Sequence, residues 1–287
     1  MRNILLFIDS AEEAEGLVKN ALKIANQCKA NLQLCNVAPS QVKEKLSVNH
    51  YYSNILLHEP EGIDIEEFAR QLKVADQING GFVPVVHCLE LSSFTPRTIR
   101  EMVIRNNVWL IIIDERQLNQ LKNIDSGNFA SRVIENINCP VLLVPQHFEM
   151  SYFHKIAYVT DLRYCDLGVV QFLKVFNAQL FVTHISAPGL PDMEERYAQE
   201  ILAEEVSVKA NYLKMFLRNL KNKNIKESVD KVLDTLEIKM LALVSKKHQT
   251  FERLFDRFPE KTQIYHNLPT LIFPYLNWFN QVSFYTQ

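Results

Sequence analysis

Residues 109–145 read WLIIIDERQLNQLKNIDSGNFASRVIENINCPVLLVP, and this stretch decides the fold class. The run WLIII has the length and composition of a strand that is buried on both faces. A polar loop follows, and Phe129, Val133 and Ile137 then recur at helical spacing until Pro140 ends the pattern. The run VLLV is a second apolar strand. A strand, a loop, a helix and a strand in this order form a βαβ unit, which predicts a parallel sheet.

The same order returns near the end of the sequence. The run MLALV at 240–244 is followed by the polar loop SKKHQT, a helix-like stretch at 251–266 and the run LPTLIFP at 268–274. In both copies a proline precedes the last strand and a second proline closes it. We therefore predict two tandem doubly wound α/β domains, each with a five-stranded parallel sheet, at 1–146 and 154–275, followed by an aromatic C-terminal tail at 276–287.

The other elements are assigned from hydrophobic periodicity. In the first half we expect strands at 3–8, 32–37 and 82–88 and helices at 11–28, 65–78 and 96–105. In the second half we expect strands at 155–160 and 179–185 and a helix at 162–176. A long charged helix is predicted at 192–220, and the third strand and its helix are then compressed into 224–237.

The composition is that of an ordinary globular chain. Of 287 residues, 47% are hydrophobic and 22% are charged, and the net charge of −2 provides no global field that favours nucleic acid. No run approaches the ~18 apolar residues that a membrane span needs, and the first apolar run ends at Asp9 without a cleavage site. The five cysteines show no C-x-x-C spacing and are expected to be free and mostly buried, with no metal site. We expect a cytoplasmic protein that contacts neither nucleic acid nor membrane.

Several stretches together resemble the universal stress protein family over nearly the whole sequence. These are the strand starts ILLFIDSAEEAEG and IAYVTD, the strand ends LQLCNVA and LFVTHISA, and the tails SRVIENINCPVLLVP and PEKTQIYHNLPTLIFP. The resemblance implies two domains of the adenine nucleotide alpha hydrolase-like fold, packed as a pseudo-two-fold pair. It also implies pairing through the last strands, in which Val141, Leu142, Leu143 and Val144 meet Thr270, Leu271, Ile272 and Phe273.

The phosphate-binding loop of that family is degenerate in this sequence. In nucleotide-binding members, a G-x2-G-x9-G-(S/T) loop after the fourth strand holds the ATP phosphates on backbone N–H groups. In the first half these positions are occupied by Asp114, Gln117, Gly127 and Asn128, so that a single glycine remains. Asp114 would place a carboxylate beside phosphate, which is unfavourable in a partly desolvated site.

The second half departs further from the family pattern. Ser245 and His248 take the first two loop positions, residues 256–257 replace the third, and the loop is shorter. Strong ATP binding is therefore not expected in either half. Lys246 and Lys247 make this loop basic, so that it could bind a small anion through side chains.

Individual residues of the resemblance have both a binding and a structural interpretation. Asp9 and Asp161 match the acid that lies against the base in ligand-bound relatives, although a helix N-cap also explains them. His184, where the family often has histidine, is expected to be structural. The candidate nucleotide-binding residues are Asp9, Val37, Gly127 and Asn128.

The sequence contains no set of nucleophile, base and orienting group, so we do not expect an enzyme. We expect a stress-response protein that binds or scaffolds a protein partner of unknown identity, without a cofactor, either as a pseudo-dimer or as a homodimer of it. Two alternatives stay open. One is ATP or AMP binding through the candidate residues of the first half, and the other is sensing of another small anion through the basic loop of the second half.

Overall fold

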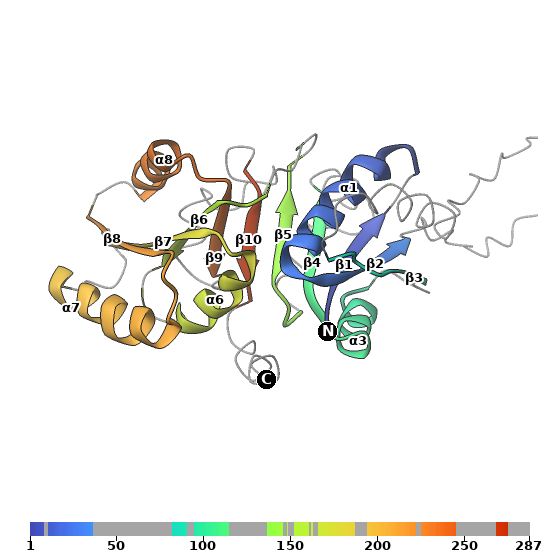
Figure 1. Ribbon diagram of the computed structural model, residues 1–287, viewed down its shortest axis with the longest axis horizontal. Coiled ribbons are helices and arrows are strands. Elements are labelled where there is room, and N and C mark those ends of the chain that lie inside the picture. The colour runs from blue at the N-terminus through green and yellow to red at the C-terminus, as the bar shows by residue number, and fades with distance from the viewer. Residues whose placement is uncertain are drawn as a thin grey trace, which may run out of the picture.

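One ten-stranded sheet runs through the described structure, with the strand order β3-β2-β1-β4-β5-β10-β9-β6-β7-β8 (Figure 1). This computed structural model describes residues 1–8, 11–36, 82–90, 95–114, 137–145, 148, 152–160, 162, 166–186, 194–221, 225–244 and 268–274. Several predicted segments lie outside these residues. They are the helices at 65–78 and 251–266, most of the helix before Pro140, and the tail at 276–287.

The first half contributes five parallel strands, which lie in the order β3-β2-β1-β4-β5. The switch from β1 back to β4 is the mark of a doubly wound sheet. Its described elements are β1 (Arg2–Ile8), α1 (Ala11–Cys28), β2 (Ala30–Asn36), β3 (Val86–Glu90), α3 (Pro96–Arg105), β4 (Val108–Asp114) and β5 (Val141–Val144).

The second half repeats this winding, because its order from the outer edge inward is β8-β7-β6-β9-β10. The predicted fold class is therefore confirmed. Its described elements are β6 (Lys155–Thr160), α6 (Asp166–Leu173), the short 3₁₀-helix η2 (Lys174–Phe176), β7 (Gln179–Ser186), α7 (Glu195–Glu200), the π-helix η3 (Ile201–Val208), β8 (Met215–Lys221), α8 (Ile225–Leu236), β9 (Met240–Val244) and β10 (Thr270–Phe273).

The inner strands are buried on both faces, as their unbroken apolar runs predict. All seven residues of β4 are buried. Along β1, Ile4, Leu6 and Ile8 face a core that includes α1, α6 and η3, and Leu5 and Phe7 face a second core that includes α3 and α8. This alternation is the period-two pattern of a strand, so that every apolar residue of the run finds a packing partner.

Strands β5 and β10 join the two halves, and theirs is the antiparallel contact among the described strand pairs. Thr270, Leu271 and Ile272 lie opposite Leu143, Leu142 and Val141, respectively. These are the two segments that the family resemblance predicts to meet. Both strands are fully buried, so the pairing removes two apolar strand edges from water.

Side chains reinforce this joint on the face of α1. The Nε2 atom of Gln27 donates to the carbonyl oxygens of Phe153 at 3.2 Å and Phe176 at 2.7 Å, and its Oε1 atom accepts the N–H of Phe153 at 3.1 Å. Trp109 of β4 stacks on Phe172 of α6, with ring centroids 4.1 Å apart. Phe172 also meets Phe273 of β10 edge-on at 5.1 Å. The two halves thus meet in an aromatic core, beside which the Gln27 side-chain amide has hydrogen-bond partners from the second half.

The predicted helix at 192–220 is wrong in its second part. The helical backbone ends at Asn211, whose φ of 47° lies in the left-handed region, and Met215–Lys221 then forms strand β8 beside β7. Asparagine is one of the few residues that end a helix in this conformation. The third strand of the second half, predicted within 224–237, therefore lies before residue 224. The helix predicted in the same segment is correctly placed and is α8. In the first half, β3 begins at Val86 and not at residue 82, because Pro84 has no N–H to give to a ladder.

A π-helix follows α7 because the apolar positions repeat every four residues. Ala198, Leu202, Val206 and Ala210 are all buried against the sheet. In an α-helix each four-residue step overshoots a full turn by about 40°. The wider turns of a π-helix, with i→i+5 hydrogen bonds, drift in the opposite sense. Joining α7 to η3 therefore keeps all four side chains on the sheet.

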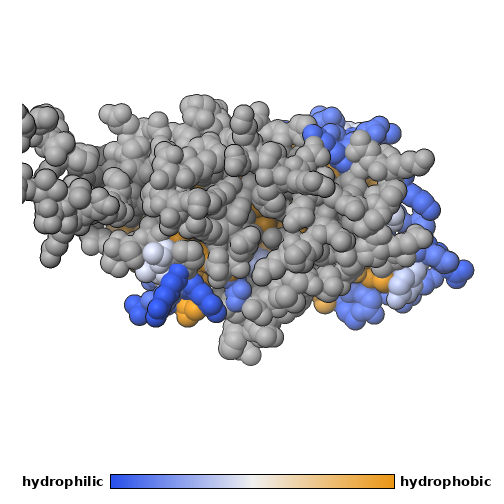
Figure 2. Space-filling model, turned by 180° about the vertical axis from the view of Figure 1, so that it is seen from behind, coloured by the Kyte–Doolittle hydropathy of each residue, from blue (hydrophilic) through white to orange (hydrophobic). Residues whose placement is uncertain are grey.

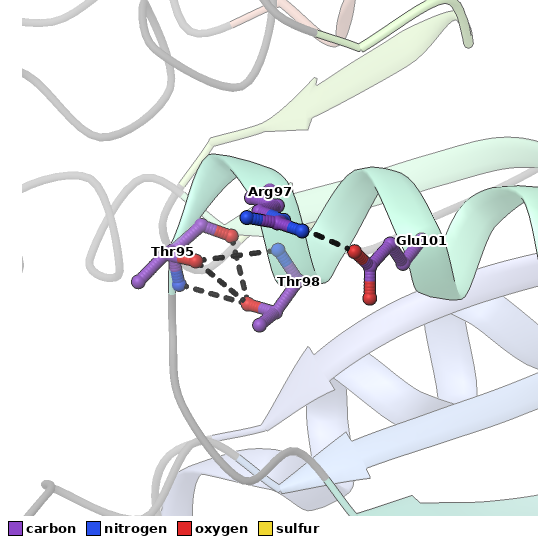
Figure 3. A network of polar contacts seen from close by, with 4 residues as sticks. All are labelled: Thr95, Arg97, Thr98 and Glu101. Atoms are coloured by element: carbon purple, nitrogen blue, oxygen red, sulfur yellow. Dashed lines mark hydrogen bonds and ion pairs between the residues drawn. The ribbon is translucent and has the colours of Figure 1, made fainter.

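The start of α3 is fixed by two threonines (Figure 3). The Oγ1 atom of Thr95 accepts the N–H of Thr98 at 3.2 Å, and the Oγ1 atom of Thr98 accepts the N–H of Thr95 at 3.0 Å. This reciprocal capping box, with Pro96 in the first turn, satisfies N–H groups that have no partner within the helix. Arg97 and Glu101 form an exposed pair one turn apart on the same helix.

The two halves should come apart more easily when the Gln27 amide is lost. Gln27→Ala removes three hydrogen bonds and leaves backbone groups of Phe153 and Phe176 without this partner, so we expect it to lower the free energy of unfolding by roughly 1–3 kcal/mol. Urea denaturation measures the change. Lys23→Ala, at an exposed position of the same helix, should stay within about 0.5 kcal/mol. Equal effects of the two substitutions would contradict this role of Gln27.

Helix ends should accept glycine with a gain in stability. Lys29 and Glu237 have φ values of 50° and 52° directly after α1 and α8, although neither is a residue that favours this conformation. We expect Lys29→Gly to raise the free energy of unfolding by about 0.5–1 kcal/mol, because relief of the strain exceeds the entropy that glycine adds to the unfolded chain. Asn107→Gly, at a φ of 50°, is the matched control and should gain less. A loss of stability in Lys29→Gly, measured by thermal unfolding, would contradict the argument.

Candidate functional site

The winding of the sheet creates two places where a ligand could bind. In open parallel sheets, ligands bind outside the carboxyl ends of the strands, at the point where the strand order reverses. Here the order reverses between β1 and β4 and again between β6 and β9. We call these places the first and the second switch point.

The sequence predicts four nucleotide-binding residues at the first switch point. Asp9, Val37, Gly127 and Asn128 all lie outside the described residues. Ile8 and Asn36, the residues directly before Asp9 and Val37 in the sequence, are register partners at the carboxyl ends of β1 and β2. The described chain therefore reaches the expected edge of the sheet immediately before both residues.

The described residue that bears most directly on phosphate binding is Asp114. It is the last residue of β4, opposite Val144 of β5, and its exposed fraction is 4%. The sequence places this aspartate at the first glycine position of the family loop, and the structure adds that the residue is buried. A phosphate brought to the end of β4 would therefore approach an acidic side chain, which is unfavourable for like charges.

The second switch point contains a turn that its own side chain closes. Thr160 ends β6, and its Oγ1 atom accepts the N–H of Leu162 at 2.9 Å. Leu162 has a φ of 58°, which is unusual for leucine, and its side chain is buried in the core. The threonine hydroxyl and the leucine packing together hold this turn. The sequence did not predict this turn. The pattern that could have indicated it is a hydroxyl side chain at a strand end, two residues before an apolar residue. Asp161, between the two, lies outside the described residues.

His184 is part of the scaffold around the second switch point. It lies opposite Thr160 in the register of β6 and β7, and its exposed fraction is 1%. Its Nδ1 atom lies 2.9 Å from Oδ1 of Asn219 in β8, and Nδ2 of Asn219 donates to the carbonyl oxygen of Glu195 at 3.5 Å. The imidazole thus ties β7 to β8, and Asn219 in turn reaches the start of α7, so that His184 has a structural role. Asn219 was missed because its segment was assigned to a helix.

The described cysteines form no disulfide, and burial suppresses the ionisation of three of them. Cys28, Cys35 and Cys139 are buried, and Cys88 is partly buried. Burial raises the pKa of the Cys35 thiol from its ordinary value of 9.0 to about 12, and it raises the pKa of Cys28 and Cys139 further. Among the described residues no group of three or more His, Cys, Asp or Glu side chains is arranged to hold a metal ion.

The basic loop of the second half, with Lys246 and Lys247, lies outside the described residues, so its anion site stays a prediction. Within the described part of the chain, no helix is long and apolar enough to cross a membrane.

Comparison with known proteins identifies the family. The fold defines the class as a doubly wound parallel α/β protein with two similar halves on one sheet. The family model for universal stress proteins matches residues 1–145, and the chain belongs to the universal stress protein family.

Solved structures share the fold over almost the whole chain. A universal stress protein from Archaeoglobus fulgidus DSM 4304 superimposes with a TM-score of 0.59 at 13% identity, over 94% of this chain and 95% of that one. A functionally unknown protein from Pseudomonas aeruginosa PAO1 gives a TM-score of 0.57 at 14% identity, over 95% of this chain and 92% of that one. Among curated protein sequences, none matches this chain. At these identities the solved structures support the fold of both halves and nothing finer.

Stability should fall at alkaline pH because of the buried thiols. The unfolded chain loses the Cys35 proton near pH 9, whereas the folded chain keeps it to about pH 12, so the unfolded state binds fewer protons between these values and gains stability there. From pH 8 to pH 10, each such thiol should lower the free energy of unfolding by about 1.4 kcal/mol. Urea denaturation at both pH values measures the fall, and Cys35→Ala should reduce it by about that amount. An unchanged fall in Cys35→Ala would contradict the assignment.

Proposed function

We propose that this chain is a non-enzymatic, cytoplasmic stress-response protein that binds or scaffolds a protein partner and does not bind ATP strongly. Membership in the universal stress protein family supports the stress-response role. The free thiols of the described cysteines fit a reducing compartment. The observation that carries the proposal is the buried carboxylate of Asp114 at the first switch point.

The size of the electrostatic effect supports weak nucleotide binding. Two like unit charges about 4 Å apart repel by roughly 4 kcal/mol at an effective dielectric constant of about 20. The family loop avoids this repulsion by placing glycine at the position that Asp114 occupies. Because the next loop position is Gln117, the backbone is also less free to approach a phosphate.

A protein that has lost phosphate binding but kept both halves intact retains surfaces for binding and scaffolding. The joint between β5 and β10, the Gln27 amide and the stacked Trp109 and Phe172 hold the two halves in one arrangement. A fixed arrangement of two domains lowers the entropic cost of binding a partner that contacts both, because less order has to be gained on binding.

Nucleotide addition should leave the thermal stability of the protein unchanged. We expect no shift of Tm with millimolar ATP, ADP or AMP, with or without Mg²⁺. A ligand that binds the folded state alone stabilises it by about 2.7 kcal/mol at a hundredfold excess over its Kd, so even modest affinity would be visible. Asp114→Asn removes the charge and nearly keeps the side-chain volume, so this variant should respond to ATP more than the wild type does.

Two outcomes would overturn this proposal. An ATP-dependent shift in the wild type that Gly127→Val abolishes would place nucleotide binding at the first switch point. A shift with inorganic phosphate that is lost in a Lys246→Ala and Lys247→Ala double variant would instead indicate an anion sensor in the second half.

A further inference from the structure

Strand β8 forms one outer edge of the sheet, at the end of the second half (Figure 1). It pairs with β7 in parallel over seven residues, from Leu180 opposite Met215 to Ser186 opposite Lys221. Within the described residues no strand lies on its other side. The strand is regular over its whole length, with no shift in its register with β7. It therefore has the geometry of a template for a further strand.

The backbone of β8 offers hydrogen-bonding groups on its outer side. The N–H of Leu180 donates to the carbonyl oxygen of Lys214 at 2.8 Å, so the backbone of Lys214 points toward β7. Because successive residues of a strand direct their N–H and C=O groups to opposite sides, Phe216, Arg218 and Leu220 also point toward β7. The backbone groups of Leu217 and Asn219, at the centre of the strand, point outward.

Apolar side chains flank these outward groups on both faces of β8. Phe216 and Leu217 are 46% and 38% exposed, and Leu213, just before the strand, is 97% exposed. Phe216 is not loose, because it stacks on Phe181 of β7 with ring centroids 5.2 Å apart. Figure 2 shows hydrophobic surface beside hydrophilic surface at this end of the molecule. An incoming strand would cover apolar surface on both faces as it pairs with the backbone.

The charges on this edge have one sign. Lys214, Arg218 and Lys221 are exposed, and β8 contains no acidic residue. The Nζ atom of Lys214 donates to two oxygens of Asn177, and the guanidinium of Arg218 lies over the ring of Phe181, so neither contact neutralises the charge. None of the three has an ion-pair partner among the described residues.

The neighbouring helix, α7 with η3, has acidic side chains, and its own bases pair with two of them. Arg196 pairs with Glu200, and Lys209 pairs with Glu205, each one turn apart on the helix. Glu200 and Glu205 are therefore engaged within the helix and do not pair with the basic residues of β8.

We propose that the outer edge of β8 binds an extended acidic segment of a protein partner, in which acidic and apolar residues alternate, as an additional strand of the sheet. Main-chain hydrogen bonds to Leu217 and Asn219 supply affinity, and the basic residues select the acidic segment. This inference deepens the proposed function, on which it rests, by naming the surface and the class of partner.

The charges argue against a second copy of this chain as the occupant. An antiparallel two-fold pairing of the whole strand with its own copy would set Arg218 opposite Arg218, at the centre of β8. Like charges directly opposite each other destabilise a strand pair. An acidic segment replaces this repulsion with attraction.

The probe for the test is a fluorescein-labelled peptide of about ten residues in which glutamate and valine alternate. A matched peptide carries lysine in place of glutamate. Fluorescence anisotropy with the full-length protein should show that the acidic peptide binds at least about tenfold more tightly, since its glutamates share one face and can lie opposite Lys214 and Arg218, so that two cross-strand charge pairs differ between the two peptides. Equal affinity for the two peptides would overturn the proposal.

Two variants locate the binding on this edge. Leu217→Pro removes an outward N–H without breaking the ladder to β7, so it should fold and lose at least about fivefold in affinity, whereas Leu217→Ala keeps the N–H and should lose less. Arg218→Glu should shift the preference toward the lysine peptide. If circular dichroism shows that Leu217→Pro does not fold, the peptide preference of Arg218→Glu becomes the test of the proposal. Wild-type affinity in a folded Leu217→Pro, or an unchanged preference in Arg218→Glu, would overturn the proposal.

Failure of this inference can be told apart from failure of the proposed function. A concentration-dependent dimer in sedimentation that Leu217→Pro abolishes would assign the edge to a second copy and overturn the proposal. A protein partner captured equally by the wild type and by Leu217→Pro would also overturn it, while the scaffolding function would stand. The ATP titration of the wild type tests that function independently of the peptide.

Discussion

The antiparallel pairing of β5 with β10 is the contact on which the rest of this structure depends. Each half ends its parallel winding with a strand of four buried residues, and each strand is followed by a buried proline. An apolar strand of this kind cannot remain at an open edge in water without inviting aggregation. Pairing the two strands turns two five-stranded sheets into one, and it brings the helices beside the joint together. The Gln27 amide and the stack of Trp109 on Phe172 follow from that placement.

The same winding decides where chemistry is possible. It brings the carboxyl ends of the strands of each half to one edge, with a switch point in each half. At the first switch point a buried aspartate stands where the family loop has glycine. At the second, Thr160, Leu162 and the pair of His184 with Asn219 are committed to holding the scaffold.

Closing the central edges leaves the outer ones to meet solvent or a partner. The described sheet has two ends, β3 and β8, and β8 combines outward backbone groups, exposed apolar side chains and exposed basic side chains. Proteins usually protect an edge strand with charge, and the charge on β8 could serve that purpose alone. The exposed Phe216, held by its stack on Phe181, adds apolar surface that protection by charge does not require.

The sequence by itself determined the class of fold, the repeat and most of the strands. Its unbroken apolar runs can be satisfied only by strands buried on both faces, and such strands need helices on both sides. The sequence also determined that Asp114 replaces a glycine. Only the tertiary structure decided the fate of residues 211–221, where local charge and spacing favoured a helix and pairing with β7 made a strand. The reason is that a helix is specified by contacts within a few residues, whereas an edge strand depends on a neighbour far along the chain. Burial of Asp114 and the meeting of Gln27 with Phe153 and Phe176 were decided in the same way, because each depends on segments far apart in the sequence. Asp114 lies beside β5 of the same half, and Gln27 meets its partners only after the two halves have joined.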